Sequence, residues 1–470
     1  MRKWNLALIV GMLITVIAGC SNSNSNSNNP ASPDNASSPS QAQSTEPAAQ
    51  EAASKEISGT VRVSLAGWPL ENGVDPVTGK PSIGVNEYLK NTFEKQYPNI
   101  KLEVNQVPWE NAQAKQTSML ISKDVDILYT AGGWSASFYQ QGLTRAIDDL
   151  VASDSSFDVS IYPQGVWDGS YSTVSADGQS HIGLPSVMGQ RMPIMDMKLF
   201  EEWGVEPLSA SPTPEEILDK ALRMTGKNPV TGEENYGLWF SGNDASVSTF
   251  FALAYAYNAT GGEGSVVDLK NMKWALNTPE MVRVFEWLAK AAMIPPVAFI
   301  NGQGAENFGV EDNDIAIALN SNGFTMMSAF AESQDSTMLD RYEPVLQKGF
   351  VAIDPIVMAK EPQDLEAAWV VMKFLAGYET QKHMYENFQY TPTLVNSDFL
   401  TPEDKYTKKA LEIADVTNEI FLTQGSPFLY SDIIPSVNNF ISDIRNGKNV
   451  NIQSYLDELQ ERAVKWSANR

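Results

Sequence analysis

The pattern of hydrophobic and polar residues opens with a strand and then alternates between helix and strand spacing. Residues 59–68, GTVRVSLAGW, place Val61, Val63 and Leu65 on one face of a predicted strand. Four elements follow by the same rules: a helix at 85–97 ended by Pro98, a strand at 100–107, a helix at 109–122 and a short buried strand at 125–130. This β–α–β–α–β order predicts a parallel sheet with helices on both faces.

Aromatic residues stand where these predicted strands end. Trp68 ends the first strand, and Trp109 follows Pro108 after the second. Tyr129 and Trp134 lie in YTAGGW, which follows the third. Because ligands of open α/β sheets bind outside the carboxyl ends of the strands, we expect a ligand site at this edge.

The rest of the chain continues the alternation of elements. Three helices are predicted to begin at Thr-Pro pairs, with the threonine as N-cap and the proline at the first helical position: Thr213, Thr278 and Thr401. Glu216 completes a capping box with the first of them. NDIAIALNSNGF, at 313–324, is typical of a strand that runs into a loop of small residues, and 361–377 of an amphipathic helix. No period of 20–50 residues recurs, which disfavours a solenoid.

The first 56 residues have a different pattern. Arg2 and Lys3 precede an apolar run at 6–17, which is too short for a membrane-spanning helix of about 18 or more residues. The following IAGC resembles the lipobox of bacterial lipoproteins, and this resemblance implies cleavage before Cys20 and lipid attachment there. Residues 21–55 are mostly Ser, Asn, Pro, Ala and Gln, so we expect a disordered tether. We therefore predict a signal peptide at 1–19 and a lipidated cysteine with its tether at 20–56.

Composition narrows the chemistry of the remaining chain. Cys20 is the only cysteine, which excludes disulfides, thiolate metal sites and thiol catalysis, and the only histidines are His181 and His383. The formal net charge is −24, so we expect no binding to nucleic acid. We also expect no cofactor and no metal. Two classes remain, a carrier of uncharged ligands and a carboxylate-based hydrolase.

Four blocks in order resemble the extracellular solute-binding proteins of carbohydrate ABC importers, of the maltose-binding-protein-like type. They are YLKNTFEKQYPNIKLEVNQVPW, KDVDILYTAGGWSASFYQQGLTRAIDDL, DGQSHIGLPSVMGQRMPIMDMKLFEEWGVEP and FVAIDPIVMAKEPQDLEAAWVVMKFL. They span nearly all of the chain after residue 57. The chain departs from the family where Met195-Asp196 replaces an aromatic–Asn pair and where residues 188–191 replace a ligand-facing acid, so the substrate class cannot be transferred.

The resemblance implies an α/β, two-lobed periplasmic-binding-protein-like fold. Each lobe would hold a mainly parallel sheet flanked by helices, and three hinge crossings would join the lobes near 186–191, 351–355 and 388–391. The expected lobes are 57–187 with 352–388 and 188–351 with 389–470. Hinge closure would trap a ligand in the cleft, and a membrane permease would recognise the closed form.

A neutral sugar needs flat aromatic side chains and a few aligned polar groups. In the first lobe the candidates are the strand-end aromatics Trp68, Trp109, Tyr129 and Trp134. By family position the second lobe supplies Trp239, Asn243, Asp244, Asn322, Phe324 and Tyr430, and Arg191 lies near the hinge. Trp287 and Trp369 fall on apolar helix stripes, where core packing is expected.

Two other functions fit parts of the sequence. A surface glycoside hydrolase needs two carboxylates roughly 5–10 Å apart, and no motif singles out such a pair. An adhesion lipoprotein would explain the anchor and the acidity but not the order of the blocks. We therefore expect a monomeric, lipid-anchored binding protein at the outer face of the cell membrane, of a Gram-positive cell in particular, or on the periplasmic side if the cell is Gram-negative. It would deliver a sugar, of oligosaccharide size in particular, to an ABC permease.

Overall fold

The computed structural model describes residues 57–469, apart from short internal gaps. The gaps are 75–80, 170–171, 241, 243–244, 265–267, 305–306, 324–325, 327–329, 331–336, 350, 402–403, 418–419 and 425. The predicted signal peptide, Cys20 and tether therefore lie outside the described residues, as do the candidates Asn243, Asp244 and Phe324. None of the helices in the described part of the chain has the length and apolar character needed to cross a membrane.

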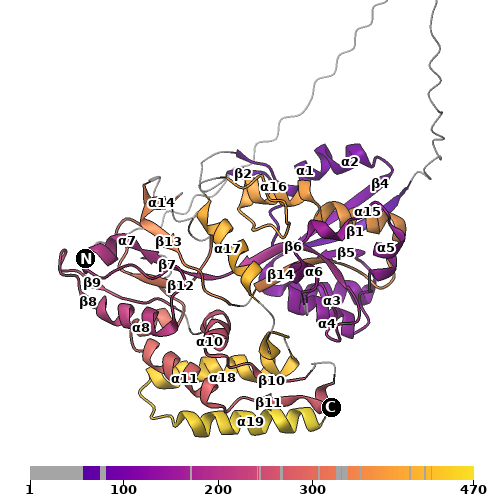
Figure 1. The fold of residues 1–470 in the computed structure, drawn as a ribbon. Coiled ribbons are helices and arrows are strands. Elements are labelled where there is room, and N and C mark those ends of the chain that lie inside the picture. Colours follow the sequence, from indigo (N-terminus) through magenta and orange to yellow (C-terminus); the bar gives the residue numbers. More distant parts are fainter. Residues whose placement is uncertain are drawn as a thin grey trace, which may run out of the picture. The chain divides into compact units, whose positions relative to one another are not determined.

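The first sheet contains the predicted parallel core (Figure 1). Its strand order is β4-β1-β5-β14-β6. The strands are β1 (Gly59–Ala66), β4 (Ile100–Val107), β5 (Ile127–Tyr129), β6 (Gly183–Gln190) and β14 (Val351–Met358). β1 pairs in parallel with β4 and β5, whereas β14 pairs antiparallel with β5 and β6. The β–α–β–α–β prediction is confirmed for β1, β4 and β5.

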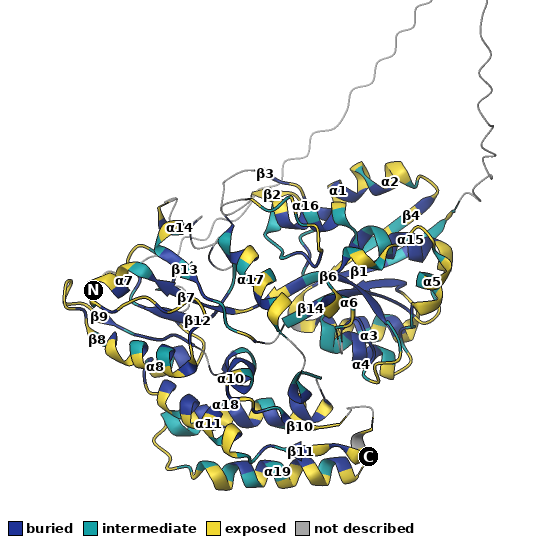
Figure 2. Ribbon diagram, in the orientation of Figure 1, coloured by how far each residue is buried: buried dark blue, intermediate teal, exposed yellow. Residues whose placement is uncertain are grey.

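Helices cover both faces of this sheet. They are α1 (Val85–Asn91), α2 (Phe93–Gln96), α3 (Ala112–Ser122), α4 (Gly132–Gln140), α5 (Asp148–Ser153), α6 (Gln164–Trp167), α15 (Leu365–Ala376) and α16 (Tyr378–Phe388). The alternating residues Val61, Val63 and Leu65 are buried in one core, which Trp369 of α15 joins. On the other face, Leu120 of α3 and Phe138 of α4 form a smaller core. Figure 2 shows the strands as the buried centre of this lobe.

The chain passes from the first sheet to the second through a single residue. β6 ends at Gln190, and β7 (Met192–Asp196) begins after Arg191 in a sheet of order β12-β7-β13. A second passage runs from β13 (Tyr342–Pro344) to β14. A third follows α16, where the Met188 amide donates to the Thr391 carbonyl at 3.0 Å before the chain reaches α17 (Lys405–Val416). Three crossings therefore join two lobes, as the resemblance implied.

The second sheet differs from the expected parallel arrangement in its strand directions. β12 (Ile317–Ser321) and β13 both pair antiparallel with β7. The parallel neighbour of β12 is the segment around Tyr236 and Trp239, which forms single bridges to Ile315 and Ala318 instead of a ladder. The α/β class is unaffected, because helices still pack on this sheet.

The described part of the second lobe contains more helix than strand. Its helices are α7 (Met197–Glu202), α8 (Pro214–Arg223), α10 (Phe250–Tyr257), α11 (Pro279–Ala291), α12 (Val297–Ile300), α14 (Met338–Arg341), α17, α18 (Ile434–Arg445) and α19 (Ile452–Ala468). A large apolar core joins α8, α10, α11, α18 and α19. Thr213 and Thr278 cap α8 and α11 as predicted. The helix expected from Thr401 begins at Lys405 instead, because Asp404 accepts the hydrogen bond of the Thr407 amide and caps it.

Short elements connect these layers. Two-stranded pairs are β2 (Gly73–Val74) with β3 (Pro81–Ser82), β8 (Gly226–Lys227) with β9 (Glu234–Asn235), and β10 (Gly261–Glu263) with β11 (Lys273–Ala275). Short helical turns are η1 (Trp109–Asn111), η2 (Val159–Ile161), η3 (Ala245–Thr249), η4 (Leu269–Asn271), η6 (Phe421–Gln424) and η7 (Leu429–Ile433). Residues 56–470 form one compact unit, so the exact lobe limits given above remain a prediction.

Candidate functional site

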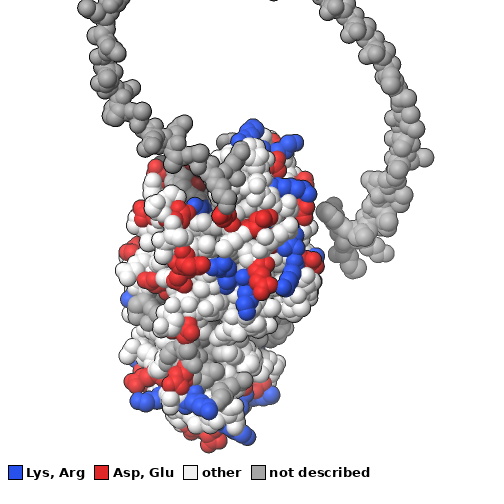
Figure 3. Space-filling model, turned by 90° about the vertical axis from the view of Figure 1, so that its right-hand side faces the viewer, with Lys and Arg blue, Asp and Glu red and all other residues white. Residues whose placement is uncertain are grey.

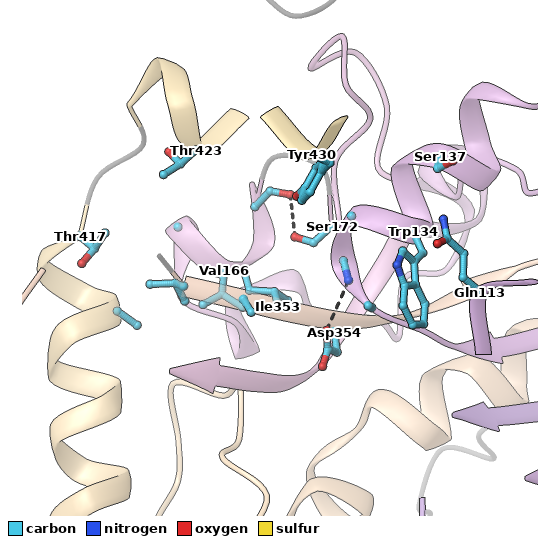
Figure 4. Close-up of a pocket in the computed structure, with 18 of the residues that line it drawn as sticks. Gln113, Trp134, Ser137, Val166, Ser172, Ile353, Asp354, Thr417, Thr423 and Tyr430 are labelled. Atoms are coloured by element: carbon cyan, nitrogen blue, oxygen red, sulfur yellow. Dashed lines mark hydrogen bonds between the residues drawn. The ribbon is translucent and has the colours of Figure 1, made fainter. Parts of the chain in front are cut away.

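A cavity of about 520 Å³ lies where the lobes meet. From the first lobe, it is lined by the start of α4 and by parts of residues 165–172. Residues 351–354 of the crossing strand β14 also line it. The second lobe contributes Tyr255, Thr417, Thr423 and Tyr430, among others (Figure 4). This volume falls within the usual range of about 300–1,000 Å³ for small-molecule sites.

The Gly-Gly turn after β5 brings the start of α4 close to β14. A Cβ atom at Gly132 would lie 2.5 Å from the Ile353 carbonyl oxygen, so no larger residue fits without displacing the backbone. A Cβ atom at Gly133 would lie 3.1 Å from the Tyr430 hydroxyl oxygen, which comes from the other lobe. These glycines therefore allow the first lobe to approach both the crossing strand and the second lobe.

An aromatic side chain from each lobe lines the cavity. Trp134 is half-buried, and its ring packs edge-on against Trp109 with centroids 5.4 Å apart. Tyr430, in η7, is 47 % exposed. Both residues were predicted from the sequence, and the cavity brings them together. The rings of Trp134 and Tyr430 are thus both accessible to a ligand. Each ring is held in place by the lobe to which it belongs.

Asp354 is a cavity residue that sequence reasoning missed. Its Oδ1 accepts a hydrogen bond from the Gly132 amide, and its Oδ2 accepts one from the Tyr129 hydroxyl, both at 3.3 Å. Burial raises the pKa of this carboxyl to about 7, against the lowering effect of the two hydrogen bonds. One signal could have found it: Asp354 is the only charged residue in the apolar run FVAIDPIVM at a predicted crossing.

The other first-lobe candidates form an aromatic cluster behind the cavity. Trp68 is fully buried and packs on Tyr129, with ring centroids 5.0 Å apart. Tyr129 is buried too and meets Trp109 edge-on at 5.9 Å, and Trp109 is 36 % exposed. None of these three is among the described lining residues, although the Tyr129 hydroxyl reaches Asp354. Their ligand roles remain predictions.

Apart from Tyr430, the described candidates of the second lobe and the hinge are not among the lining residues of this cavity. Trp239 is buried, and its Nε1 donates to the Gln303 carbonyl at 3.0 Å. Arg191 is exposed at the first crossing, where Nη1 donates to the Asn320 carbonyl at 3.1 Å. Asn322 follows β12. The expected core roles of Trp287 and Trp369 agree with their burial.

Charged groups are sparse at the cavity. Among its described lining residues, Asp354 is the only carboxylate, and no lysine or arginine lines it. The described residues contain no group of three or more His, Cys, Asp or Glu side chains suited to a metal ion. On the molecular face of Figure 3, acidic and basic side chains are interspersed over the described surface. The cavity suits an uncharged ligand better than an anion.

Comparison with known proteins identifies the family. Residues 79–382 match the model of the bacterial extracellular solute-binding proteins. The chain belongs to this family. A binding protein of Brucella abortus is 22 % identical over 416 residues, which cover 80 % of this chain and 91 % of that protein.

Solved structures of solute-binding proteins share the fold. An ABC substrate-binding protein from Listeria monocytogenes, in complex with cycloalternan, superposes with a TM-score of 0.65 at 18 % identity, over 87 % of this chain and 99 % of that one. The sugar-binding protein MalE from Xanthomonas citri superposes with a TM-score of 0.67 at 16 % identity, and the match covers 88 % of this chain and 98 % of MalE. The two-lobed α/β fold is thereby confirmed. Membership of the extracellular solute-binding protein family makes this chain a binding protein and not an enzyme.

Proposed function

We propose that this solute-binding protein captures an uncharged carbohydrate in the interlobe cavity and delivers it to an ABC-transporter permease. The observation that carries the proposal is the pair Trp134 and Tyr430, which bring an aromatic face from each lobe to one cavity. The apolar face of a sugar ring stacks on such side chains, and its hydroxyls need polar partners nearby. The amide of Gln113 and the hydroxyls of Thr417 and Thr423 line the same space.

The fold relatives support the same ligand class. Similar solute-binding proteins of known structure hold cycloalternan, α-D-tagatose or D-mannitol as bound ligands. These ligands are neutral and rich in hydroxyl groups, and they range from a polyol to an oligosaccharide. A ligand that contacts both lobes binds the closed form better and so drives closure. The permease would recognise that closed form.

Binding is tested by a thermal-shift screen of residues 57–470 against neutral monosaccharides, oligosaccharides and polyols. A ligand present at 100 times its Kd adds about 2.7 kcal/mol of stability. One clear hit with no product formed supports the proposal. Silence across the panel would contradict it. A sugar that is cleaved would favour the hydrolase alternative, although the described cavity lining lacks the second carboxylate that a glycosidase uses.

Trp134→Ala and Tyr430→Ala should each weaken binding of the screen's hit by about 10- to 100-fold, because each removes the stacking face supplied by one lobe. Isothermal titration calorimetry measures the change. Tyr97→Ala is the matched control, since Tyr97 packs on Phe93 beyond the cavity lining. Equal affinities for all three variants would mean that the sugar binds elsewhere.

The membrane anchor is a separate part of the proposal. Cys20 follows IAG after a basic and apolar leader, which supports cleavage and lipidation at that residue. Several acyl chains would hold the protein on a bilayer, since each buried methylene contributes about 0.8 kcal/mol. Mass spectrometry of the mature N-terminal peptide tests this. Replacing Cys20 by alanine should release the protein from the membrane fraction.

A further inference from the structure

Asp354 lies at the point where the crossing strand changes its pairing. Register along β14 and β6 shifts between Asp354 and Pro355, because proline has no amide hydrogen to donate to the ladder. Such a bulge redirects the neighbouring side chains. Figure 4 shows the Asp354 carboxylate turned toward the start of α4, on the same cavity as Trp134.

The carboxylate has hydrogen-bonding capacity that the described residues do not use. Two oxygens offer about four acceptor positions, and this carboxylate has two donors among the described residues. Both contacts are 3.3 Å long, whereas hydroxyl donors approach an ionised carboxylate to about 2.5–2.7 Å. Hydroxyl groups of a ligand would therefore form shorter bonds than either protein donor.

Within the described part of the chain, no basic side chain pairs with this carboxylate. The ionisable groups that face it are the phenols of Tyr129 and Tyr390, and burial raises the pKa of both. Neither β6 nor α4 contains a charged residue. On α15, which also packs against β14, Lys373 is paired with Asp154, and Glu366 lies in the first turn. Negative charge on a ligand would consequently meet an unpaired carboxylate.

We propose that Asp354 is the specificity-determining residue of the site, accepting hydrogen bonds from two adjacent hydroxyls of a neutral sugar or polyol and excluding sugar acids. This inference rests on the proposed carbohydrate function and deepens it. Because β14 crosses between the lobes, a ligand held by Asp354 lies within the space that both Trp134 and Tyr430 line. The hinge strand would then contribute to recognition as well as to motion.

Ionisation of Asp354 gives the proposal a measurable signature. The ionised carboxylate accepts hydrogen bonds from hydroxyls more strongly than the protonated carboxyl does, so the affinity for a neutral sugar should decrease as pH falls through about 7. For a single group of this pKa, the ionised fraction, and with it the affinity, decreases about tenfold between pH 8 and pH 6. No other described lining residue titrates in this range, because the cavity has no histidine.

The test is calorimetry with D-mannitol, D-gluconate and maltotriose at pH 6 and pH 8. It uses the wild type, Asp354→Asn, Asp354→Ser and the exposed-acid control Asp312→Asn. We expect the wild type and the control to bind D-mannitol or maltotriose about tenfold more tightly at pH 8, and D-gluconate at least tenfold more weakly than D-mannitol. At pH 8, Asp354→Asn should bind the neutral probes at least tenfold more weakly than the wild type. Its affinity should not depend on pH.

The outcomes separate the two proposals. If the wild type binds a neutral probe with equal affinity at both pH values, or binds D-gluconate as tightly as D-mannitol, the role of Asp354 is overturned and the carbohydrate function stands. Unchanged affinity in Asp354→Asn would also overturn it. If the wild type binds neither neutral probe nor any sugar of the screen, the carbohydrate function itself fails. The pH dependence of wild-type affinity tests the role of Asp354 even if both Asp354 variants fold poorly.

Discussion

Arg341→Met is expected to lower the free energy of unfolding by about 3–5 kcal/mol. The Arg341 guanidinium holds the carboxylate of Asp196, which is fully buried at the end of β7. Nε donates to Oδ1 at 2.8 Å and Nη2 to Oδ2 at 2.6 Å. Removing the arginine leaves a buried carboxylate without its counter-charge. Urea denaturation followed by tryptophan fluorescence and circular dichroism measures the loss.

A matched arginine and a double variant identify the cause. Arg223 pairs with Asp219 at 3.7 Å on the surface of α8, where both side chains are more than half exposed, so Arg223→Met should cost less than about 1 kcal/mol. Combining Arg341→Met with Asp196→Asn should recover part of the loss, because the neutral amide needs no counter-charge. If Arg341→Met costs no more than Arg223→Met, the buried pair has no special role.

This ion pair shows what local sequence could not provide. The replacement of an aromatic–Asn pair by Met195-Asp196 was visible as a departure from the family. The pairing of Asp196 with Arg341 could not be predicted from the sequence. Asp196 and Arg341 are 145 positions apart and meet only when β13 pairs with β7. The replacement of the family's aromatic–Asn pair by Met195-Asp196 therefore has a structural role, because it introduces a buried carboxylate that pairs with Arg341.

The aromatic candidates likewise show which features the local sequence predicts and which depend on packing. Spacing and turn residues correctly predicted the strands β1, β4 and β5, and with them the edge where Trp68, Trp109 and Trp134 stand. Which of these rings lines the cavity depends on non-local packing. Trp68 is covered by Tyr129, whereas the Gly-Gly turn leaves Trp134 at the lobe boundary. Strand-end position therefore locates a site more reliably than it selects its residues.

The second expected result concerns the stability of the unliganded protein. Asp354→Asn should be about 2–4 kcal/mol more stable than the wild type at pH 8 and equal to it near pH 4. The wild-type carboxyl has a pKa of about 7 when folded and close to the ordinary value of 3.8 when unfolded. Between these values the folded state binds the extra proton, so wild-type stability falls as pH rises from about 4 to about 7. An asparagine has no such proton to lose.

The magnitude follows from the difference between the two pKa values. Each unit of pKa corresponds to about 1.4 kcal/mol, and partial exposure of Asp354 to solvent reduces the full difference. Urea unfolding of Asp354→Asn, Asp312→Asn and the wild type between pH 4 and pH 8 measures it. Equal wild-type and Asp354→Asn curves across this range would show that the carboxylate is well solvated. A gain in stability together with lost sugar affinity would show that the protein retains a destabilising charge because the ligand requires it.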